Sequence, residues 1–548
     1  MTEGDRAVTP GDWVEFLQSR ESDELFREIY GDRPGLISER KGSFRRLVEH
    51  FAAVFGEDRE LILARSPCRI NLMGMHVEHR GGFVNYVTHS KEIIAAAARN
   101  GGDKVDMVDI RSGSFPRRGF EIGEEIGLGD FSDWVKYIES PRVVERVGEN
   151  QGDWSNYVKA GVLRLQNRFS DTPLHGMDMA FLGNIPTSSG LSSSSAMVVV
   201  SSLAAIEVNG LSVEESELVN LCGEGEWYVG TRGGAGDHAA MLFCRRESIC
   251  HLRFFPFEVT EYLPFPPGHD IVIANSMKSA HKAGEVLDAY NQTIAAYNMV
   301  LMMIKSAMAD MGFSRDIIEG TRHLRDVNPE RIPLVDIYRI IGSLPDRATR
   351  DYLRQKFEGM TEGIEHIFRT HREPGRGYRI RSVALFGVAE CERGRRFADI
   401  LGAGDVEELG RLMLIEHDGD RVVQNEGGLE RPWINDLGDD RVRRLIEDSS
   451  SDDPRRLARA RLHYQPGGYG CSSPELDEMV DIARSVPGVL GAGLTGAGFG
   501  GCIRILVRSE STAALIDALK SRYYDPRGLP SAAEVIQTVA RAGVLGRE

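Results

Sequence analysis

Residues 183–198 read Gly-Asn-Ile-Pro-Thr-Ser-Ser-Gly-Leu-Ser-Ser-Ser-Ser-Ala-Met-Val and indicate most clearly how this chain folds. The pattern predicts a strand over 178–185, a loop of small residues, and a helix through Ala196 to Ala205. Such a junction points unpaired amide N–H groups and the positive helix end into one space, which suits a phosphate. The serine hydroxyls add donors and a ligand for Mg²⁺. No Walker sequence follows the glycine, and the flanking apolar runs argue against a serine-rich linker.

The composition excludes several classes of protein. The chain has 548 residues, of which 41% are hydrophobic and 27% charged, as in soluble globular proteins. A formal net charge of −16 with no basic arm argues against nucleic-acid binding. The seven scattered cysteines favour reduced thiols over disulfides or a CxxC-type zinc site. The acidic, polar N-terminus resembles no signal peptide, and no apolar run is long enough to span a membrane, so we expect a cytoplasmic protein.

The chain divides into segments of different character. Residues 1–60 predict amphipathic helices, and Pro264 to Gly268 is the clearest linker-like stretch, which separates 61–268 from 269–548. Residues 309–375 are charged and helix-rich and are expected to form a helical insertion that packs or covers the site. A second glycine cluster runs from Gly488 into a strand over 502–507. No internal repeat is visible.

Three motifs carry a family resemblance. They are Cys68-Arg-Ile-Asn-Leu-Met-Gly-Met-His-Val-Glu-His-Arg-Gly-Gly82, the serine loop from Pro186 to Ala196, and Leu494-Thr-Gly-Ala-Gly-Phe-Gly-Gly501. In this order they resemble the GHMP small-molecule kinases, and most of all the galactokinase branch, over roughly 60–305 and 380–508. The resemblance implies an α/β fold of two lobes with the active site between them. The first lobe, 61–268, is expected to be ribosomal S5 domain 2-like and to bind ATP, and the second, 269–548, to be ferredoxin-like.

The resemblance also implies how ATP and Mg²⁺ are held. Phosphoryl transfer requires bound phosphates, neutralised charge and an aligned hydroxyl. Ser194 matches the metal-binding serine of the family. Glu226, eleven residues before Asp237, is expected to bind Mg²⁺ together with Ser194. An ordinary solvated glutamate on a helix surface is the alternative for Glu226. The expected nucleotide-binding residues are Pro186, Ser189, Gly190, Leu191, Ser192, Ser193, Ser194 and Ser195.

Asp237 and Arg69 match the catalytic residues of galactokinase-like enzymes. Asp237 lies in Gly-Gly-Ala-Gly-Asp-His, a turn whose glycines allow close approach of a substrate. Its carboxylate is suited to accept the proton of the sugar hydroxyl, and Arg69 would keep it ionised and stabilise phosphate charge. A helix N-cap is the alternative interpretation of Asp237, and the two roles are compatible.

The expected sugar-binding residues are Met75, His76, Glu78, Gly236 and Tyr290. Galactokinases have Glu-His-x-Asp-Tyr where this chain has Met-His-Val-Glu-His, so Met75 removes a negative charge that would repel a sugar acid. The motif of galacturonokinases is more similar, and Arg80 adds a cation that could pair a carboxylate or simply be a solvated turn residue. For Tyr290 the alternative is a packed helix tyrosine.

The sequence therefore predicts an ATP- and Mg²⁺-dependent kinase of the anomeric hydroxyl of a sugar, with galacturonate or a related acid as acceptor. Galactokinase, arabinokinase and heptose kinase activities are alternatives within this class. A catalytically silent sensor of ATP and sugar is the alternative from another class. Such a sensor should lack Ser193, Ser194, Asp237 or Arg69, whereas all four are present. The sequence does not specify an oligomeric state.

Overall fold

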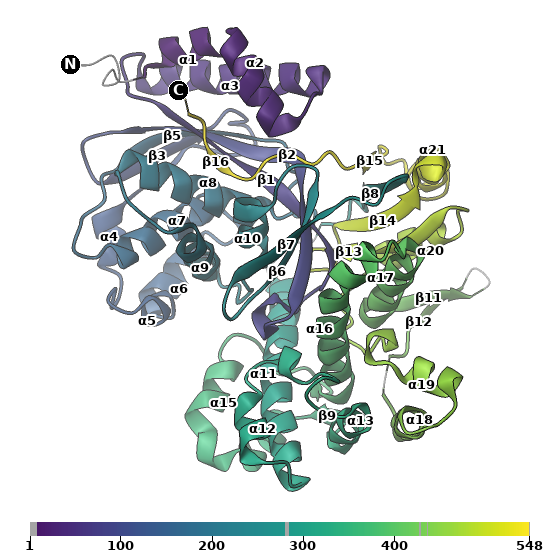
Figure 1. The fold of residues 1–548 in the computed structure, drawn as a ribbon. Helices are drawn as coiled ribbons and strands as arrows, with labels where there is room; N and C mark the ends of the chain where they lie inside the picture. Colours follow the sequence, from purple (N-terminus) through teal and green to yellow (C-terminus); the bar gives the residue numbers. More distant parts are fainter. Residues whose placement is uncertain (1–7, 280–283, 427–428, 436, 547–548) are drawn as a thin grey trace.

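The computed structural model describes residues 8–279, 284–426, 429–435 and 437–546. The N-terminal residues 1–6, which showed no signal-peptide character, lie outside this range. Within it, no helix is long and apolar enough to cross a membrane. The chain forms an α/β fold in which two sheets, each packed with helices, lie side by side (Figure 1), so the predicted fold class is confirmed.

The larger sheet has eight strands, and its main path runs β16-β1-β2-β5-β3-β4, with β6 pairing both β2 and β7. The bounds are β1 Ile62–Met73, β2 Phe83–Arg99, β3 Lys104–Asp109, β4 Arg118–Glu121, β5 Met177–Gly183, β6 Ser248–Arg253, β7 Glu258–Pro264 and β16 Gly543–Val544. Strands β1 and β2 pair with shifts of register between Pro67 and Cys68 and between Asn71 and Met73. Such irregularities redirect the side chains beside them, and here they flank Arg69.

Helices cover both faces of this sheet. Because strand side chains alternate between faces, Ala95 and Ala97 of β2 join one core while Ile94 and Ala96 join another. The N-terminal helices lie over this face of the sheet (Figure 1), and the second core includes their buried Phe44. These helices are α1 Pro10–Phe16, α2 Arg20–Tyr30 and α3 Pro34–Phe55. The opposite face carries α7 Ser155–Arg168, α8 Ser193–Val208, α9 Glu215–Glu226 and α10 Gly236–Phe243, and the connections add α4 Ile122–Ile126, α5 Trp134–Ile138 and α6 Pro141–Glu149.

The second sheet is antiparallel with the order β13-β14-β8-β15. Its strands are β8 His269–Asn275, β13 Val489–Thr495, β14 Cys502–Arg508 and β15 Ala533–Val535, and its helices include α17 Val406–Asp420, α20 Pro474–Arg484 and α21 Thr512–Leu519. The predicted strand over 502–507 is confirmed. The glycine loop 496–501 between β13 and β14 faces the first lobe, so the second sheet contributes directly to the cavity described below.

A helical region extends beyond the second sheet (Figure 1). It is built on α11 Gly284–Asp310 and α16 Arg381–Gly402, against which residues 309–375 pack. Its other helices are α12 Arg315–Gly320, α13 Leu334–Ser343, α14 Arg350–Lys356, α15 Thr361–Phe368, α18 Asp439–Ser449 and α19 Pro454–Ala460, with small ladders β9 Arg347–Ala348, β10 Tyr378–Arg379, β11 Val423–Glu426 and β12 Leu429–Pro432. Buried side chains of α13, such as Ile337 and Ile341, belong to the same hydrophobic core as the two sheets.

The last residues return to the first lobe. After β15, the tail passes along β1 and β2, where Thr88 Oγ1 donates to the Val539 carbonyl. Arg65 Nη1 donates to the carbonyls of Ala540 and Arg541 at 3.0 and 2.7 Å. Strand β16 then pairs antiparallel with β1 and forms the edge of the first sheet. Although 269–548 was expected to form the second lobe, residues 543–544 belong to the sheet of the first.

Candidate active site

A cavity of about 510 Å³ lies where β1, the serine loop, α10, α11 and the glycine loop meet. Twelve of the sixteen residues predicted from the sequence line it: Arg69, Met75, His76, Glu78, Ser189, Gly190, Ser192, Ser193, Ser194, Glu226, Asp237 and Tyr290. The other four, Pro186, Leu191, Ser195 and Gly236, do not line it. The structure thus brings the three sequence motifs together around one space.

Arg69 and Asp237 form the best-defined pair in this cavity. Arg69 Nε and Nη2 donate to Asp237 Oδ1 and Oδ2 at 2.6 and 2.7 Å, and Nη1 donates to the Gly190 carbonyl at 2.8 Å. Ser192 Oγ donates to Oδ2 at 2.5 Å. Burial lowers the pKa of the Arg69 guanidinium, but Asp237 raises it more, so the net pKa is above its ordinary value. The guanidinium is therefore protonated, and its two parallel hydrogen bonds fix the orientation of the carboxylate.

Asp237 is not the N-cap of its helix. The N-cap of α10 is Ala235, and no side chain caps this end. Asp237 lies in the first turn, where the helix dipole favours its negative charge. The capping interpretation of Asp237 is therefore wrong, and its carboxylate is directed to Arg69 and the cavity.

The serine loop has a strained backbone that opens it toward the cavity. Ser188, Gly190 and Ser192 all have positive φ, at 52°, 78° and 56°. Helix α8 begins at Ser193, three residues before the predicted start, because serine fits the first turn of a helix well. The amides of its first turn have no carbonyl partner within the helix, as at any helix start, and Ser193 and Ser194 line the cavity.

The remaining residues of this loop fix its shape. Ser189 Oγ donates to the Pro186 carbonyl at 2.8 Å, and Leu191 is buried at 2% exposure in the main core. Neither Pro186 nor Leu191 lines the cavity.

The glycine loop packs directly against the serine loop. A Cβ at Gly190 would lie 2.7 Å from the Thr495 carbonyl oxygen, one at Gly496 would lie 2.4 Å from the Gly190 oxygen, and one at Gly501 would lie 2.5 Å from the Ser189 oxygen. Real side chains do not approach backbone so closely. The glycines of both motifs are thus required for the contact between the two lobes.

Glu226 is buried rather than solvated. Its residue exposure is 7%, its Oε2 accepts a hydrogen bond from Ser195 Oγ at 2.7 Å, and His238 Nε2 lies 3.1 Å from the same oxygen. The alternative of a surface glutamate is therefore wrong. Glu226 and Ser194 line the same cavity, where a carboxylate and a hydroxyl offer the hard oxygen ligands that Mg²⁺ prefers.

The first motif forms another part of the cavity wall. Met75 is 2% exposed, and its amide donates to Glu390 Oε1 at 2.9 Å and to Glu416 Oε1 at 3.1 Å. Glu78 packs under the turn of Asp237, since a Cβ at Gly234 or Gly236 would lie 2.7 or 3.0 Å from its Cγ. Burial raises the pKa of Glu78, but the neighbouring His79 lowers it, and the net pKa lies below its ordinary value.

Tyr290 reaches the same wall from α11. It lines the cavity, and a Cβ at Gly233 would lie 2.7 Å from its Oη. Burial raises the pKa of its phenol well above the ordinary value, so the hydroxyl is neutral. Tyr290 therefore presents a neutral hydroxyl to the turn that carries Asp237.

Arg80 corrects the sequence interpretation. Its guanidinium does not line the cavity and is not solvated; it donates to Asn298 Oδ1 and to the Ile294 carbonyl and lies over the ring of Tyr297 at 5.4 Å. Burial also lowers its pKa to about 10. Arg80 therefore joins the first motif to α11 and is not placed to pair a substrate carboxylate.

Sequence reasoning missed one side of the cavity. Phe115, Trp154 and Tyr157 form an aromatic wall there, next to Arg111, which forms two hydrogen bonds to Asp109 at 2.9 and 2.8 Å. Trp154 and Tyr157 lie where α7 begins. Asp109 ends β3 and Arg111 follows it, in a stretch without any recognisable motif, so only the fold brings them to the site.

Comparisons with known proteins agree with this geometry. Family models for the GHMP kinases N terminal domain and the GHMP kinases C terminal match residues 156–245 and 442–525. The galactokinase galactose-binding signature matches residues 49–99. The chain thus contains the N- and C-terminal domains of GHMP kinases together with a galactokinase signature. It is a sugar kinase that resembles the galactokinases, as the sequence predicted.

Relatives of similar length support this assignment. The galactokinase of Dictyostelium discoideum is 25% identical over 522 residues, covering 88% of each chain, and that of Bacillus subtilis is 25% identical over 87% of this chain and 93% of its own. The crystal structure of Lactococcus lactis galactokinase complexed with galactose matches with a TM-score of 0.60 and 22% identity, over 91% of this chain and 99% of that one. This last likeness shows the same fold.

Proposed function

We propose that this protein transfers the terminal phosphoryl group of ATP to the anomeric hydroxyl of a neutral hexose of the galactose type. The observation that carries the proposal is the Asp237 carboxylate, which two N–H groups of Arg69 hold at the wall of a cavity shared with a serine loop. The galactose-binding signature spans Arg69, Met75, His76 and Glu78, and the relatives described above are galactokinases.

The donor side of the proposed reaction uses the serine loop. The start of α8 offers amide N–H groups and hydroxyls to the phosphates of ATP. Ser194 and Glu226 would hold Mg²⁺, which supplies charge neutralisation to the phosphates when bound. The aromatic wall of Phe115, Trp154 and Tyr157 suits a nucleobase, which stacks on flat apolar surfaces.

On the acceptor side, Asp237 would orient the anomeric hydroxyl. As the new O–P bond forms and the bond from the terminal phosphorus to ADP breaks, the hydroxyl proton passes to the carboxylate and later to solvent. Because Arg69 and Ser192 donate three hydrogen bonds to this carboxylate, it is a weak base. We therefore propose that its main contribution is orientation, with proton transfer late in the step, while Arg69 adds positive charge beside the transferred phosphoryl group.

The charges of the cavity support a neutral acceptor. Its lining among the described residues includes four carboxylates (Glu78, Asp109, Glu226 and Asp237) and two arginines, Arg69 and Arg111, each paired with one of them. A sugar acid would bring another negative charge into this partly desolvated space. Galacturonate remains the second candidate. At position 75 the cavity wall has the apolar Met75, where galactokinases have a glutamate that would repel a sugar acid.

A measurement of ATP consumption tests the acceptor. The purified protein is assayed with galactose, galacturonate, glucuronate, arabinose and heptoses, and phosphorus NMR identifies the product as an anomeric phosphate. We expect kcat/KM to be highest for galactose. A preference for galacturonate would contradict the charge argument, and no turnover with any sugar would favour the silent sensor.

The cellular setting is a separate proposal. All seven cysteines are buried free thiols, which suits a reducing compartment such as the cytoplasm. Measurement of the chain's location in fractionated cells tests it.

A further inference from the structure

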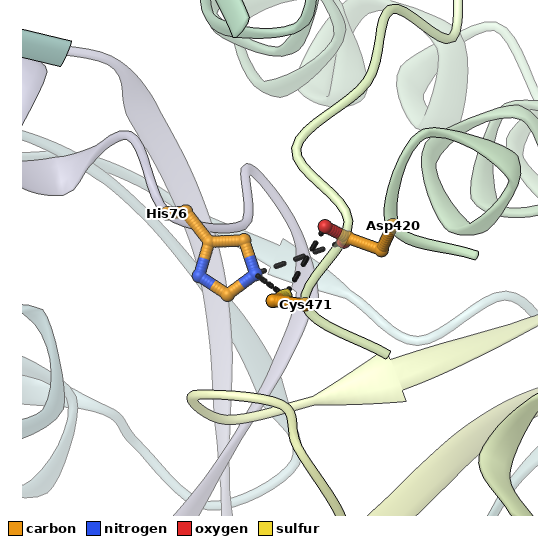
Figure 2. Close-up of side chains that lie close together, drawn as sticks. All are labelled: His76, Asp420 and Cys471. Atoms are coloured by element: carbon orange, nitrogen blue, oxygen red, sulfur yellow. Dashed lines mark hydrogen bonds and ion pairs between the residues drawn. The ribbon is translucent and has the colours of Figure 1, made fainter. Parts of the chain in front are cut away.

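Three side chains from distant parts of the chain converge beside the cavity (Figure 2). His76 follows β1, Asp420 ends α17, and Cys471 precedes α20. Cys471 Sγ lies 3.2 Å from His76 Nε2 and 3.2 Å from Asp420 Oδ1, and His76 Nε2 lies 3.7 Å from Asp420 Oδ2. Imidazole, thiolate and carboxylate are the three ligand types that bind zinc in proteins.

Hydrogen bonding alone does not satisfy this cluster. One S–H proton and one ring N–H can serve the two contacts of Cys471, but Asp420 Oδ2 then has no hydrogen-bond partner within the described part of the chain. The Asp420 side chain is fully buried, at 0% exposure, so water does not compensate this oxygen. A buried carboxylate oxygen beside an imidazole and a thiol, with no hydrogen-bond partner among the described residues, points to a cation as its partner.

The spacing fits an ion. One ligand atom from each of the three residues lies within 4.8 Å of the other two, and Cys471 Sγ lies 3.2 Å from both His76 Nε2 and Asp420 Oδ1. These separations suit three ligands of one Zn²⁺, whose bonds to nitrogen, oxygen and sulfur are about 2.0 to 2.3 Å long. Mg²⁺ is a poor occupant because it prefers oxygen ligands alone. With Cys471 as thiolate and Asp420 as carboxylate, the two negative charges of the ligands balance the two positive charges of the ion. The occupied site would then carry no net charge.

The surroundings hold the three ligands in place. His76 has a positive φ of 61° and stacks on Tyr469 at a centroid distance of 4.7 Å. The Cys471 carbonyl accepts the Phe499 amide at 2.6 Å, and a Cβ at Gly498 would lie 2.8 Å from Cys471 Sγ. The ligands are thus ordered before any ion binds, which lowers the entropic cost of binding.

We propose that His76, Asp420 and Cys471 form a binding site for Zn²⁺, with water in the fourth position. Binding forms a Zn–S bond and releases the thiol proton of Cys471 to solvent. Through these ligands, the ion joins the turn after β1 in the first lobe to the end of α17 and to the loop before α20 in the second lobe. It therefore stabilises the contact between the lobes and fixes His76 at the cavity wall, independently of which sugar is the substrate.

Metal binding to the full chain tests the proposal. The protein is stripped with a chelator, dialysed without nucleotide or sugar, and titrated with Zn²⁺ alone and with Co²⁺ alone. We expect one tightly bound Zn²⁺ per chain, a rise in Tm on Zn²⁺ addition, and a thiolate-to-cobalt charge-transfer band with Co²⁺. The band should disappear in Cys471→Ser, and Asp420→Asn should bind Zn²⁺ at least tenfold more weakly. Cys222→Ser, which alters another buried thiol, should keep the band.

The wild-type titration decides the question even if a variant fails to fold. Absence of bound Zn²⁺ and of the band in the wild-type protein would overturn the proposal and leave a hydrogen-bonded cluster only. A band that persists in folded Cys471→Ser would equally overturn it, because another thiol would then be the ligand. Failure of the sugar-kinase assay does not bear on these outcomes, since none of them measures activity.

Discussion

The Asp237 carboxylate receives two parallel hydrogen bonds from Arg69, from Nε at 2.6 Å and from Nη2 at 2.7 Å. The pair joins a strand residue to the first turn of a helix, and Ser192 of the serine loop donates to the same carboxylate. One side chain thus links the residues assigned to the acceptor with those assigned to the donor, and its charge should control turnover more than nucleotide binding.

Asp237→Asn should lower kcat by about 10²- to 10⁴-fold, because the amide orients the hydroxyl poorly, accepts no proton and leaves Arg69 without its anion. Nucleotide affinity, measured by calorimetry, should change little. The control Asp171→Asn alters an exposed loop residue and should be active. Near-normal kcat in Asp237→Asn would remove this residue from the mechanism.

Glu226→Gln should raise the Mg²⁺ concentration needed for half-maximal rate by about tenfold or more, because the amide is a weaker ligand than the carboxylate. The KM for sugar should be nearly unchanged. Glu224→Gln is the matched control, since Glu224 lies on the same helix but pairs with Arg164 at 2.7 Å and is 37% exposed. If both variants require the same Mg²⁺ concentration as the wild-type protein, Glu226 is not a metal ligand.

Gly190→Ala should weaken ATP binding and lower the free energy of unfolding, because φ is +78° and the new Cβ would lie 2.7 Å from the Thr495 carbonyl oxygen. Gly210→Ala is the control that distinguishes backbone strain from a steric clash. Gly210 also has a positive φ, of +59°, but no atom lies within 4 Å of the position of the new Cβ. In the control, only the backbone strain of the new alanine should lower the free energy of unfolding, by about 1–2 kcal/mol, and the ATP affinity should be unchanged. Denaturant unfolding and ATP titration measure the two effects. Equal behaviour of the variants would contradict the packing argument.

Glu534→Gln should remove an acid-sensitive contribution to stability. Burial raises the pKa of Glu534, but His89 and Lys91 lower it more, to about 2. A carboxyl with a lowered pKa stabilises the fold above its unfolded pKa of about 4.3 and loses this contribution as pH falls toward 2. The variant should therefore be less stable than the wild-type protein at pH 7, and the difference should shrink below pH of about 4.3. The exposed Glu510→Gln should show no such convergence; a difference that stays constant with pH would contradict the linkage.

Local patterns predicted the parts of the site that lie within one stretch of sequence. The strand, loop and helix around Ser192 follow from residue type alone, and the resemblance to known kinases supplied the link between Arg69 and Asp237, which are far apart in the chain. The direction of Arg80 was not predictable, because its partners Asn298 and Ile294 lie on α11, more than 200 residues away. No pattern in the sequence connects His76, Asp420 and Cys471 either, since their contacts depend on how the two lobes pack.

The pairing of β16 with β1 has a consequence for biosynthesis. Residues 543–544 complete the edge of a sheet whose other strands are made from residues 62–264. While the ribosome is still translating the second lobe, β1 therefore has an unpaired backbone edge, which can pair with other chains. The first lobe reaches its final hydrogen bonding only after residues 543–544 have been made and have left the ribosome, so the two lobes do not mature as independent cotranslational units.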